Sequence, residues 1–135
     1  MTSPVTVLIV DDHELIRHGL STSFLLDPAT EVVGTAASVQ EALEAFGQHR
    51  PDVVVTDLQL PDGTGLDIVR SVRRDSPTTG LVVLTMHSGD EQIFAAMEAG
   101  ASAFVGKDAP SAEVVKAAKH AALAAKWGLL EGSAG

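Results

Sequence analysis

Apolar residues are distributed along this chain in two alternating patterns, short continuous runs and stripes with helical spacing. Continuous apolar runs rich in β-branched residues are typical of strands that are buried on both faces of a sheet. Turn residues, prolines or charged residues bound each run, which marks where a strand ends. We therefore predict strands at 5–10, 31–36, 52–57, 80–85 and 101–106.

The segments between these runs carry apolar residues three or four positions apart, as one face of a helix does. A helix is predicted to follow His13, and Ser38 with Glu41 forms a capping box that predicts the start of the next. The expected inner stripes are Ile16, Leu20 and Phe24; Val39, Ala42, Leu43 and Phe46; Leu66, Val69 and Val72; Ile93, Ala96 and Met97; and Val114, Val115, Ala118 and Ala122. We expect the third helix to span Gly63 to Ser76, with Arg70, Arg73 and Arg74 at a solvated end.

Five strands that alternate with five helices indicate an α/β fold, a doubly wound parallel sheet with helices on both faces. The flavodoxin-like strand order is 2-1-3-4-5, which puts a crevice between the first and third strands. The 135 residues suit one domain, predicted at 1–125. Residues 126–135 are predicted to be the start of a linker or a disordered tail, because their Gly, Ser and Ala content gives no reason for order.

The net charge of -9 makes the chain a poor nucleic-acid binder, because it repels phosphate backbones. The absence of cysteine excludes disulfides and thiolate metal sites. The apolar run at 5–10 is too short for a secretory signal, and no stretch approaches a membrane span. We expect a cytoplasmic protein.

Polar residues stand where the predicted strands end. The first strand ends in Asp11 and Asp12, the third in Asp57, the fourth in Thr85 and the fifth in Lys107. The carboxyl ends of parallel strands are where ligands bind, so these side chains are expected to flank one crevice. Each acid alone could instead cap the helix or turn that follows it.

Three carboxylates, a hydroxyl and an ammonium in one crevice suit phosphoryl transfer. Carboxylates bind Mg²⁺, and an aspartate can itself be a nucleophile that forms an acyl phosphate. Lys107 and Thr85 offer hydrogen-bond donors to phosphoryl oxygens. Such a transfer mainly needs positioning and charge neutralisation, which these five residues could supply together.

Four segments resemble the response-regulator receiver (CheY-like) family, namely Val7–His13, Asp57–Gly63, Leu84–His87 and Gly100–Lys107. They are most similar to receivers of the NarL/FixJ group, which carries a LuxR-type helix-turn-helix, and the resemblance covers Val5 to Ala125. It implies that Asp57 accepts a phosphoryl group from a sensor histidine kinase. It also implies that Thr85 and Lys107 bind the phosphoryl oxygens, and that Thr85 and Phe104 change conformation as the switch.

The resemblance further implies that Mg²⁺ is the cofactor, held by Asp12, Asp57 and the backbone carbonyl of Gln59, with Asp11 acting through water. Phosphorylation would promote a homodimer, and DNA would be bound only through a C-terminal domain that is absent from this chain. The protein would be a phosphoacceptor switch that phosphorylates and dephosphorylates itself rather than an enzyme.

Several residues depart from the family pattern or adjust it. Phe104 lacks a tyrosine hydroxyl, so its switch must work by packing, and Met86 narrows access to the site. Gln59 and His87 are expected to tune hydrolysis of the acyl phosphate, and His87 is interpreted as a solvent-facing loop residue rather than a metal ligand. The family often has a cis bond after the lysine; without proline at 108 this would cost ~3 kcal/mol, and we treat it as a hypothesis.

Two other functions are compatible with the same residues. A phosphatase of the haloacid-dehalogenase type also uses a strand-end aspartate and Mg²⁺, but it has a second aspartate where Gln59 stands here. A receiver that works as an interaction module without phosphorylation is the other alternative. The complete set of five strand-end residues favours the phosphoacceptor.

Overall fold

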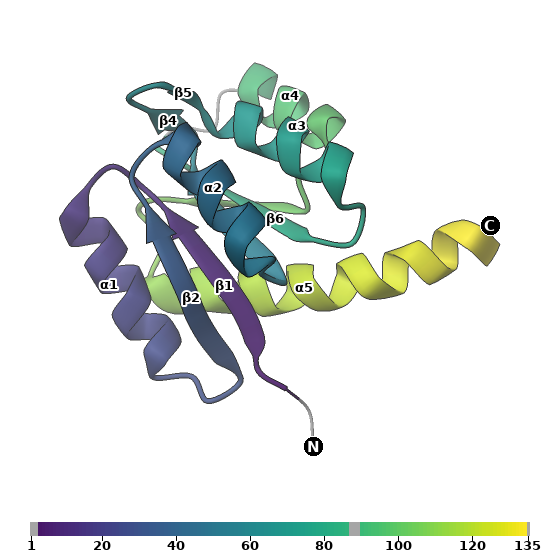
Figure 1. Cartoon of the computed structure of the whole chain (residues 1–135), viewed down its shortest axis with the longest axis horizontal. Helices are drawn as coiled ribbons and strands as arrows, with labels where there is room; N and C mark the ends of the chain where they lie inside the picture. The colour runs from purple at the N-terminus through teal and green to yellow at the C-terminus, as the bar shows by residue number, and fades with distance from the viewer. Residues whose placement is uncertain (1–2, 87–89, 135) are drawn as a thin grey trace.

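The computed structural model describes the backbone of residues 3–86 and 90–134 and the side chains of residues 3–86 and 93–124. Five parallel strands form its main sheet in the order β2-β1-β3-β6-β7 (Figure 1). They are β1 (Val5–Val10), β2 (Thr30–Ala36), β3 (Val53–Asp57), β6 (Gly80–Thr85) and β7 (Ala103–Gly106). Because β6 and β7 are the fourth and fifth long strands along the chain, the predicted order 2-1-3-4-5 is confirmed.

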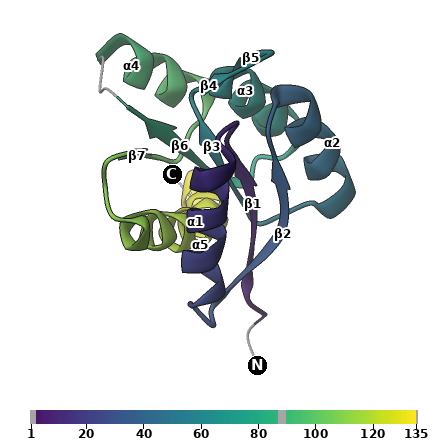
Figure 2. The same ribbon diagram turned by 90° about the vertical axis from the view of Figure 1, so that its left-hand side faces the viewer.

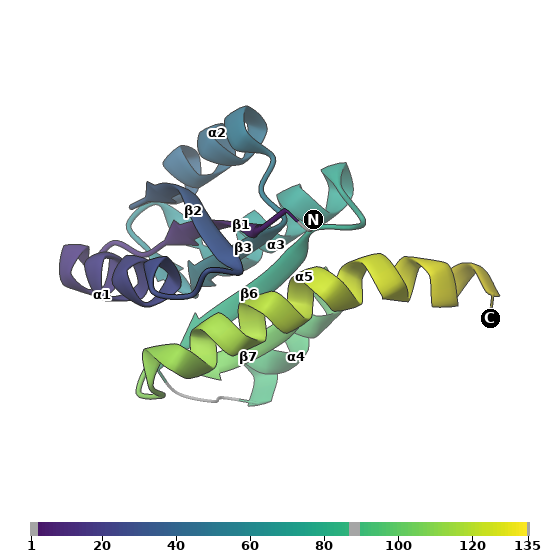
Figure 3. The same ribbon diagram turned by 90° about the horizontal axis from the view of Figure 1, so that it is seen from below.

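Five helices cover the two faces of this sheet, as predicted. They are α1 (Glu14–Leu25), α2 (Val39–His49), α3 (Gly65–Asp75), α4 (Asp90–Ala99) and α5 (Ser111–Ala134). Helices α1 and α5 pack on one face, and α2, α3 and α4 pack on the other (Figures 2 and 3). The doubly wound arrangement leaves the carboxyl ends of the strands open at one edge of the sheet.

The central strand β3 shows why continuous apolar runs are required here. All of its residues are buried; Val54 joins the cluster under α2, α3 and α4, whereas Val53 and Val55 join the cluster under α1 and α5. Full burial of such a side chain contributes roughly 1.5–3 kcal/mol, so both faces of the strand stabilise the fold. The strand is therefore a rigid support for the residue at its end, Asp57.

A short antiparallel hairpin follows β3, where the sequence predicted only a turn. Its strands are β4 (Gln59–Leu60) and β5 (Gly63–Thr64), with Gln59 opposite Thr64. The hairpin takes up the residues at which α3 was predicted to begin, so that helix starts at Gly65. Two-residue strands are too short to show a hydrophobic period, which is why the pattern did not reveal them.

The last helix is longer than predicted. The chain remains helical in α5 up to Ala134, whereas residues 126–135 were predicted to be a linker or disordered tail. In Figures 1 and 3 the end of α5 projects beyond the sheet. Alanine, leucine, lysine and glutamate are strong helix formers, and they outweigh the two glycines, Gly128 and Gly132, that lie within this part of the helix. Where the domain itself ends stays a prediction.

The hypothesis of a cis bond between Lys107 and Asp108 is wrong. Among the described residues no peptide bond is cis. Without a proline the trans form is favoured by about 3 kcal/mol.

The sequence analysis expected the arginines at the end of α3 to be solvated, but one of them, Arg73, is partly buried. The Arg73 guanidinium donates to the carbonyl oxygens of Gly100, Ser76 and Thr79, and burial lowers its pKa. Gly100 has a φ of 110°, and a Cβ there would lie 2.8 Å from Arg73 Cγ. Arg73 therefore joins the ends of α3 and α4 to the start of β6.

Candidate functional site

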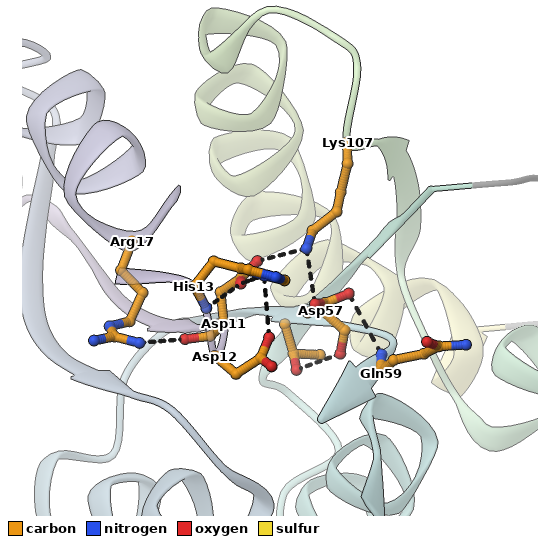
Figure 4. Close-up of polar contacts among 8 residues, drawn as sticks. Asp11, Asp12, His13, Arg17, Asp57, Gln59 and Lys107 are labelled. Carbon is orange, nitrogen blue, oxygen red and sulfur yellow. Dashed lines mark hydrogen bonds and ion pairs between the residues drawn. The ribbon is translucent and has the colours of Figure 1, made fainter. Parts of the chain in front are cut away.

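The carboxyl ends of three strands bring predicted site residues together at one edge of the sheet (Figure 4). Asp11 follows β1, Asp57 ends β3, and Lys107 follows β7. Because these strands are parallel, their ends lie at the same edge, although Asp57 and Lys107 are 50 residues apart in the sequence. Asp11, Asp57 and Lys107 therefore lie close together, as the sequence predicted.

The Lys107 ammonium lies between two carboxylates. Its Nζ donates to Asp57 Oδ2 at 2.8 Å and is 3.0 Å from Asp11 Oδ2. The side chains of Lys107, Asp57 and Asp11 are 6%, 8% and 0% exposed. Burial acts to lower the pKa of Lys107, but the hydrogen bonds and charges of Asp57 and Asp11 outweigh it and raise the pKa. Lys107 is therefore a charged, fixed donor at neutral pH.

The edge carries more negative charge than Lys107 neutralises. Asp11, Asp12, His13 and Asp57 each offer a ligand atom, and these atoms lie within 4.8 Å of one another. Asp12 is 37% exposed in its side chain, so one side of the cluster opens to solvent. Against three carboxylates the one buried ammonium leaves an excess negative charge that attracts a cation.

The donor set fits a divalent, oxygen-binding cation such as Mg²⁺. Asp11 Oδ2 is buried, and the Lys107 ammonium that it contacts at 3.0 Å is shared with Asp57. Burying two carboxylates around one shared ammonium is costly, and a nearby cation or a bound water would offset that cost. Carboxylate oxygens with open positions for water are the environment in which Mg²⁺ is usually bound.

Gln59 adjoins the site through its backbone. Its amide nitrogen is 3.4 Å from Asp57 Oδ1, a long hydrogen bond that helps to orient the carboxylate. Gln59 is exposed and lies in β4, immediately beyond the end of β3. Its predicted part in metal binding, through the carbonyl oxygen, stays a prediction.

Thr85 and Phe104 lie on the neighbouring strands. Thr85 is the buried last residue of β6, and its carbonyl accepts the backbone N–H of Lys107 at 2.9 Å. Phe104 is half-buried in β7 opposite Val83 and packs against the cluster under α2, α3 and α4. Met86 is 69% exposed at the end of β6, and His87 lies outside the described residues. The switch roles of Thr85 and Phe104 stay predictions.

Two residues at this edge were not identified from the sequence. His13 Nδ1 lies 3.0 Å from Asp11 Oδ1 and 3.2 Å from Asp12 Oδ1. Arg17 donates from its guanidinium to the Asp11 carbonyl at 2.6 Å. A histidine next to the acid pair and an arginine one helical turn later are the signals that could have indicated these contacts.

Comparison with known proteins identifies the chain's relatives. Residues 7–119 match the family model described as the response regulator receiver domain. The chain is 42% identical over 115 residues to the DNA-binding transcriptional activator DevR/DosR of Mycobacterium tuberculosis, covering 85% of this chain and 53% of that protein. It is 33% identical over 124 residues to the nitrate/nitrite response regulator protein NarP of Escherichia coli, covering 92% and 58%.

Solved structures agree with these sequence matches. The signal receiver domain of the response regulator NarL from Mycobacterium tuberculosis superposes with a TM-score of 0.85 at 31% identity, over 90% of this chain and 98% of that one. The chain thus spans little more than half the length of its curated relatives but nearly all of an isolated receiver domain. No helix within the described residues is long and apolar enough to cross a membrane.

Proposed function

The chain belongs to the response regulator receiver domain family, and on this premise we propose that Asp57 accepts a phosphoryl group from the phosphohistidine of a sensor histidine kinase. The observation that carries the proposal is the contact of Lys107 Nζ with Asp57 Oδ2 at 2.8 Å, beside the acid cluster. In this reaction a carboxylate oxygen of Asp57 forms the bond to phosphorus as the bond between phosphorus and the kinase histidine nitrogen breaks. The transfer is a substitution with no net redox change.

The chain's own residues are proposed to position the phosphoryl group and to donate hydrogen bonds to its oxygens. Lys107 already pairs with Asp57, so its ammonium is available to an oxygen of the incoming phosphoryl group. Thr85, at the end of the adjoining strand, is proposed to donate its hydroxyl to another oxygen. The backbone amide of Gln59 contacts Asp57 Oδ1 at 3.4 Å, which helps to fix the orientation of the carboxylate.

A bound Mg²⁺ completes the proposed site. Asp12 and Asp57 would ligate it with the backbone carbonyl of Gln59, and Asp11 would act through water. The ion would neutralise the charge of the acid cluster and of the phosphoryl oxygens.

The output is proposed to be transcriptional. Phosphorylation would move Thr85 and Phe104 and promote a homodimer, and a C-terminal DNA-binding domain of the longer protein would then bind its sites in the cytoplasm. The names of the relatives, a DNA-binding transcriptional activator and a nitrate/nitrite response regulator, support this direction. The acidic chain itself is not expected to contact DNA.

The phosphatase alternative is not favoured by the site. The residue two positions after Asp57 is Gln59, whose side-chain amide cannot transfer a proton as a carboxyl group does. The interaction-module alternative does not explain why Lys107 is buried between two carboxylates, because such a buried ion pair adds little stability by itself.

The test is incubation of the protein with Mg²⁺ and acetyl phosphate, followed by intact-mass measurement. Wild-type protein should gain a single phosphoryl group, and the gain should disappear in Asp57→Asn and in excess chelator. Asp75→Asn, at an exposed aspartate paired with Arg50, is the matched control and should be phosphorylated as wild type is. Equal labelling of Asp57→Asn and wild type, or no labelling of either, would contradict the proposal.

A further inference from the structure

The tip of the β4–β5 hairpin contacts the N-terminus of α2. Asp62 Oδ1 accepts the backbone N–H of Val39 at 2.7 Å, and Asp62 Oδ2 accepts that of Gln40 at 3.0 Å. These amides belong to the first turn of the helix, where backbone N–H groups have no partner within the helix. A carboxylate is favoured there by the helix dipole as well. Both oxygens of one side chain from the loop after Asp57 are thus committed to α2.

The rest of the helix cap comes from α2's own neighbourhood. Ser38 Oγ accepts the N–H of Glu41 at 3.1 Å, and Glu41 Oε1 accepts that of Ala37 at 3.2 Å. Asp62 is therefore not needed to replace a missing local cap. Its two bonds add a connection between the helix and the hairpin, across 22 and 23 residues of sequence.

The hairpin also packs closely against α2 and α3. A Cβ on Gly63 would lie 2.7 Å from Asp67 Oδ2 and 3.2 Å from Val39 Cγ2, so only glycine fits the tip without displacement. The hydrogen bonds from Gln40 and Val39 lower the pKa of Asp62, which keeps its carboxylate ionised. The contact is thus a built one, with two hydrogen bonds and a close approach of the backbone.

We propose that Asp62 is a positioning residue that fixes the loop carrying Gln59 by anchoring it to the N-terminus of α2. Gln59 pairs with Thr64, and Leu60 with Gly63, so the whole hairpin moves as one piece with its tip. The amide of Gln59 in turn holds Asp57 Oδ1. The inference rests on the proposed function, in which the Gln59 carbonyl and Asp57 hold Mg²⁺.

The expected consequence is on metal affinity. Groups that orient metal ligands without touching the metal change its affinity by about 10–100-fold when they are removed. Asp62→Asn retains the size of the side chain but replaces one acceptor oxygen with a donating NH₂ group and removes the charge, so the present pair of bonds, one to each oxygen, is lost. We expect the dissociation constant for Mg²⁺ to rise about tenfold in this variant.

The matched control is Ser38→Ala, which removes a cap hydrogen bond from the same end of α2, one that Ser38 makes to Glu41 of the helix itself and not to the hairpin. Both variants should lower the melting temperature, because each weakens the same helix end. Calorimetric titration of Mg²⁺ into wild type and both variants separates the two roles. Amide hydrogen exchange at Gln59 gives a second readout, which should become faster in Asp62→Asn and remain unchanged in Ser38→Ala.

The outcomes distinguish this inference from the function beneath it. Weaker Mg²⁺ binding and faster exchange at Gln59 in Asp62→Asn alone would support the anchor. If wild type binds Mg²⁺ and the two variants bind it equally well, Asp62 is only a helix cap and the inference is overturned. If wild-type protein binds no Mg²⁺ and is not phosphorylated, the proposed function fails and the inference fails with it.

Discussion

Two lysine–aspartate pairs in this molecule have nearly the same length and different surroundings. Lys107 Nζ is 2.8 Å from Asp57 Oδ2, and Lys119 Nζ is 2.7 Å from Asp27 Oδ2. The first pair is 6% and 8% exposed, whereas the second is 40% and 21% exposed. The length of an ion pair alone does not distinguish a functional contact from a structural one. Its burial and the charges around it do distinguish them.

The neighbours of each pair explain what it does. Lys107 pairs with two carboxylates at the carboxyl-terminal edge of the sheet. Asp12 adds a third carboxylate there, so negative charge remains in excess. Asp27 has one cation and a backbone donor, Ala29, and the hydrogen bond from Lys119 is the main reason that its pKa is lowered. The Asp27–Lys119 pair is balanced and joins α5 to the end of α1. The Asp57–Lys107 pair is part of an acidic cluster with three carboxylates, which could hold a further cation.

The largest effect is expected when the buried ammonium is removed. In metal-free buffer Lys107→Met should lower the free energy of unfolding by about 3–5 kcal/mol, because it leaves buried carboxylates without their cation. The raised pKa of Lys107 means that its contribution is complete below the ordinary value of 10.5 and is lost only as the pH rises through the folded value. Urea unfolding at neutral pH measures the change, and a loss below 1 kcal/mol would contradict it.

A change of opposite sign is expected at the exposed acid. Asp12→Asn should raise the free energy of unfolding in metal-free buffer by about 1 kcal/mol, because it reduces repulsion among Asp11, Asp12 and Asp57. The same variant should lose most of its Mg²⁺ affinity. Paired thermal melts with and without Mg²⁺ test both statements; destabilisation of the metal-free variant would oppose the idea of excess charge.

A small effect is expected at the exposed pair. Lys119→Met should lower the melting temperature slightly, and added salt should reduce the difference because exposed pairs are screened. Phosphorylation by acetyl phosphate should be unchanged. A loss of phosphorylation comparable to that of Lys107→Met would show that the two pairs are not separable.

The smallest effect concerns acid stability. Because the pKa of Asp27 is lowered from 3.8, its contribution is present in full above that value and is lost as the pH falls below it through the folded pKa. Asp27→Asn should therefore show a shallower loss of stability than wild type below about pH 4. Melting temperatures measured across this range provide the test, and parallel curves would contradict it.

The sequence predicted the features that depend on local pattern. Continuous apolar runs gave the five strands, and the rule that parallel strands end at one edge was enough to expect Asp57 and Lys107 together. The sequence did not reveal the contact of Asp62 with Val39, because no local pattern indicates a hydrogen-bond partner 23 residues away. The hairpin was too short for a period, and the end of α5 was obscured by glycines in a good helical sequence.

Borohydride reduction of the phosphorylated protein followed by peptide mapping tests the central claim most directly. The reagent converts an aspartyl phosphate to homoserine, so the acceptor is identified by its position in the sequence. We predict homoserine at position 57 after treatment with Mg²⁺ and acetyl phosphate, and none when Mg²⁺ is withheld. Homoserine at position 11 or 12, or no homoserine in protein that carries a phosphoryl group, would contradict the account.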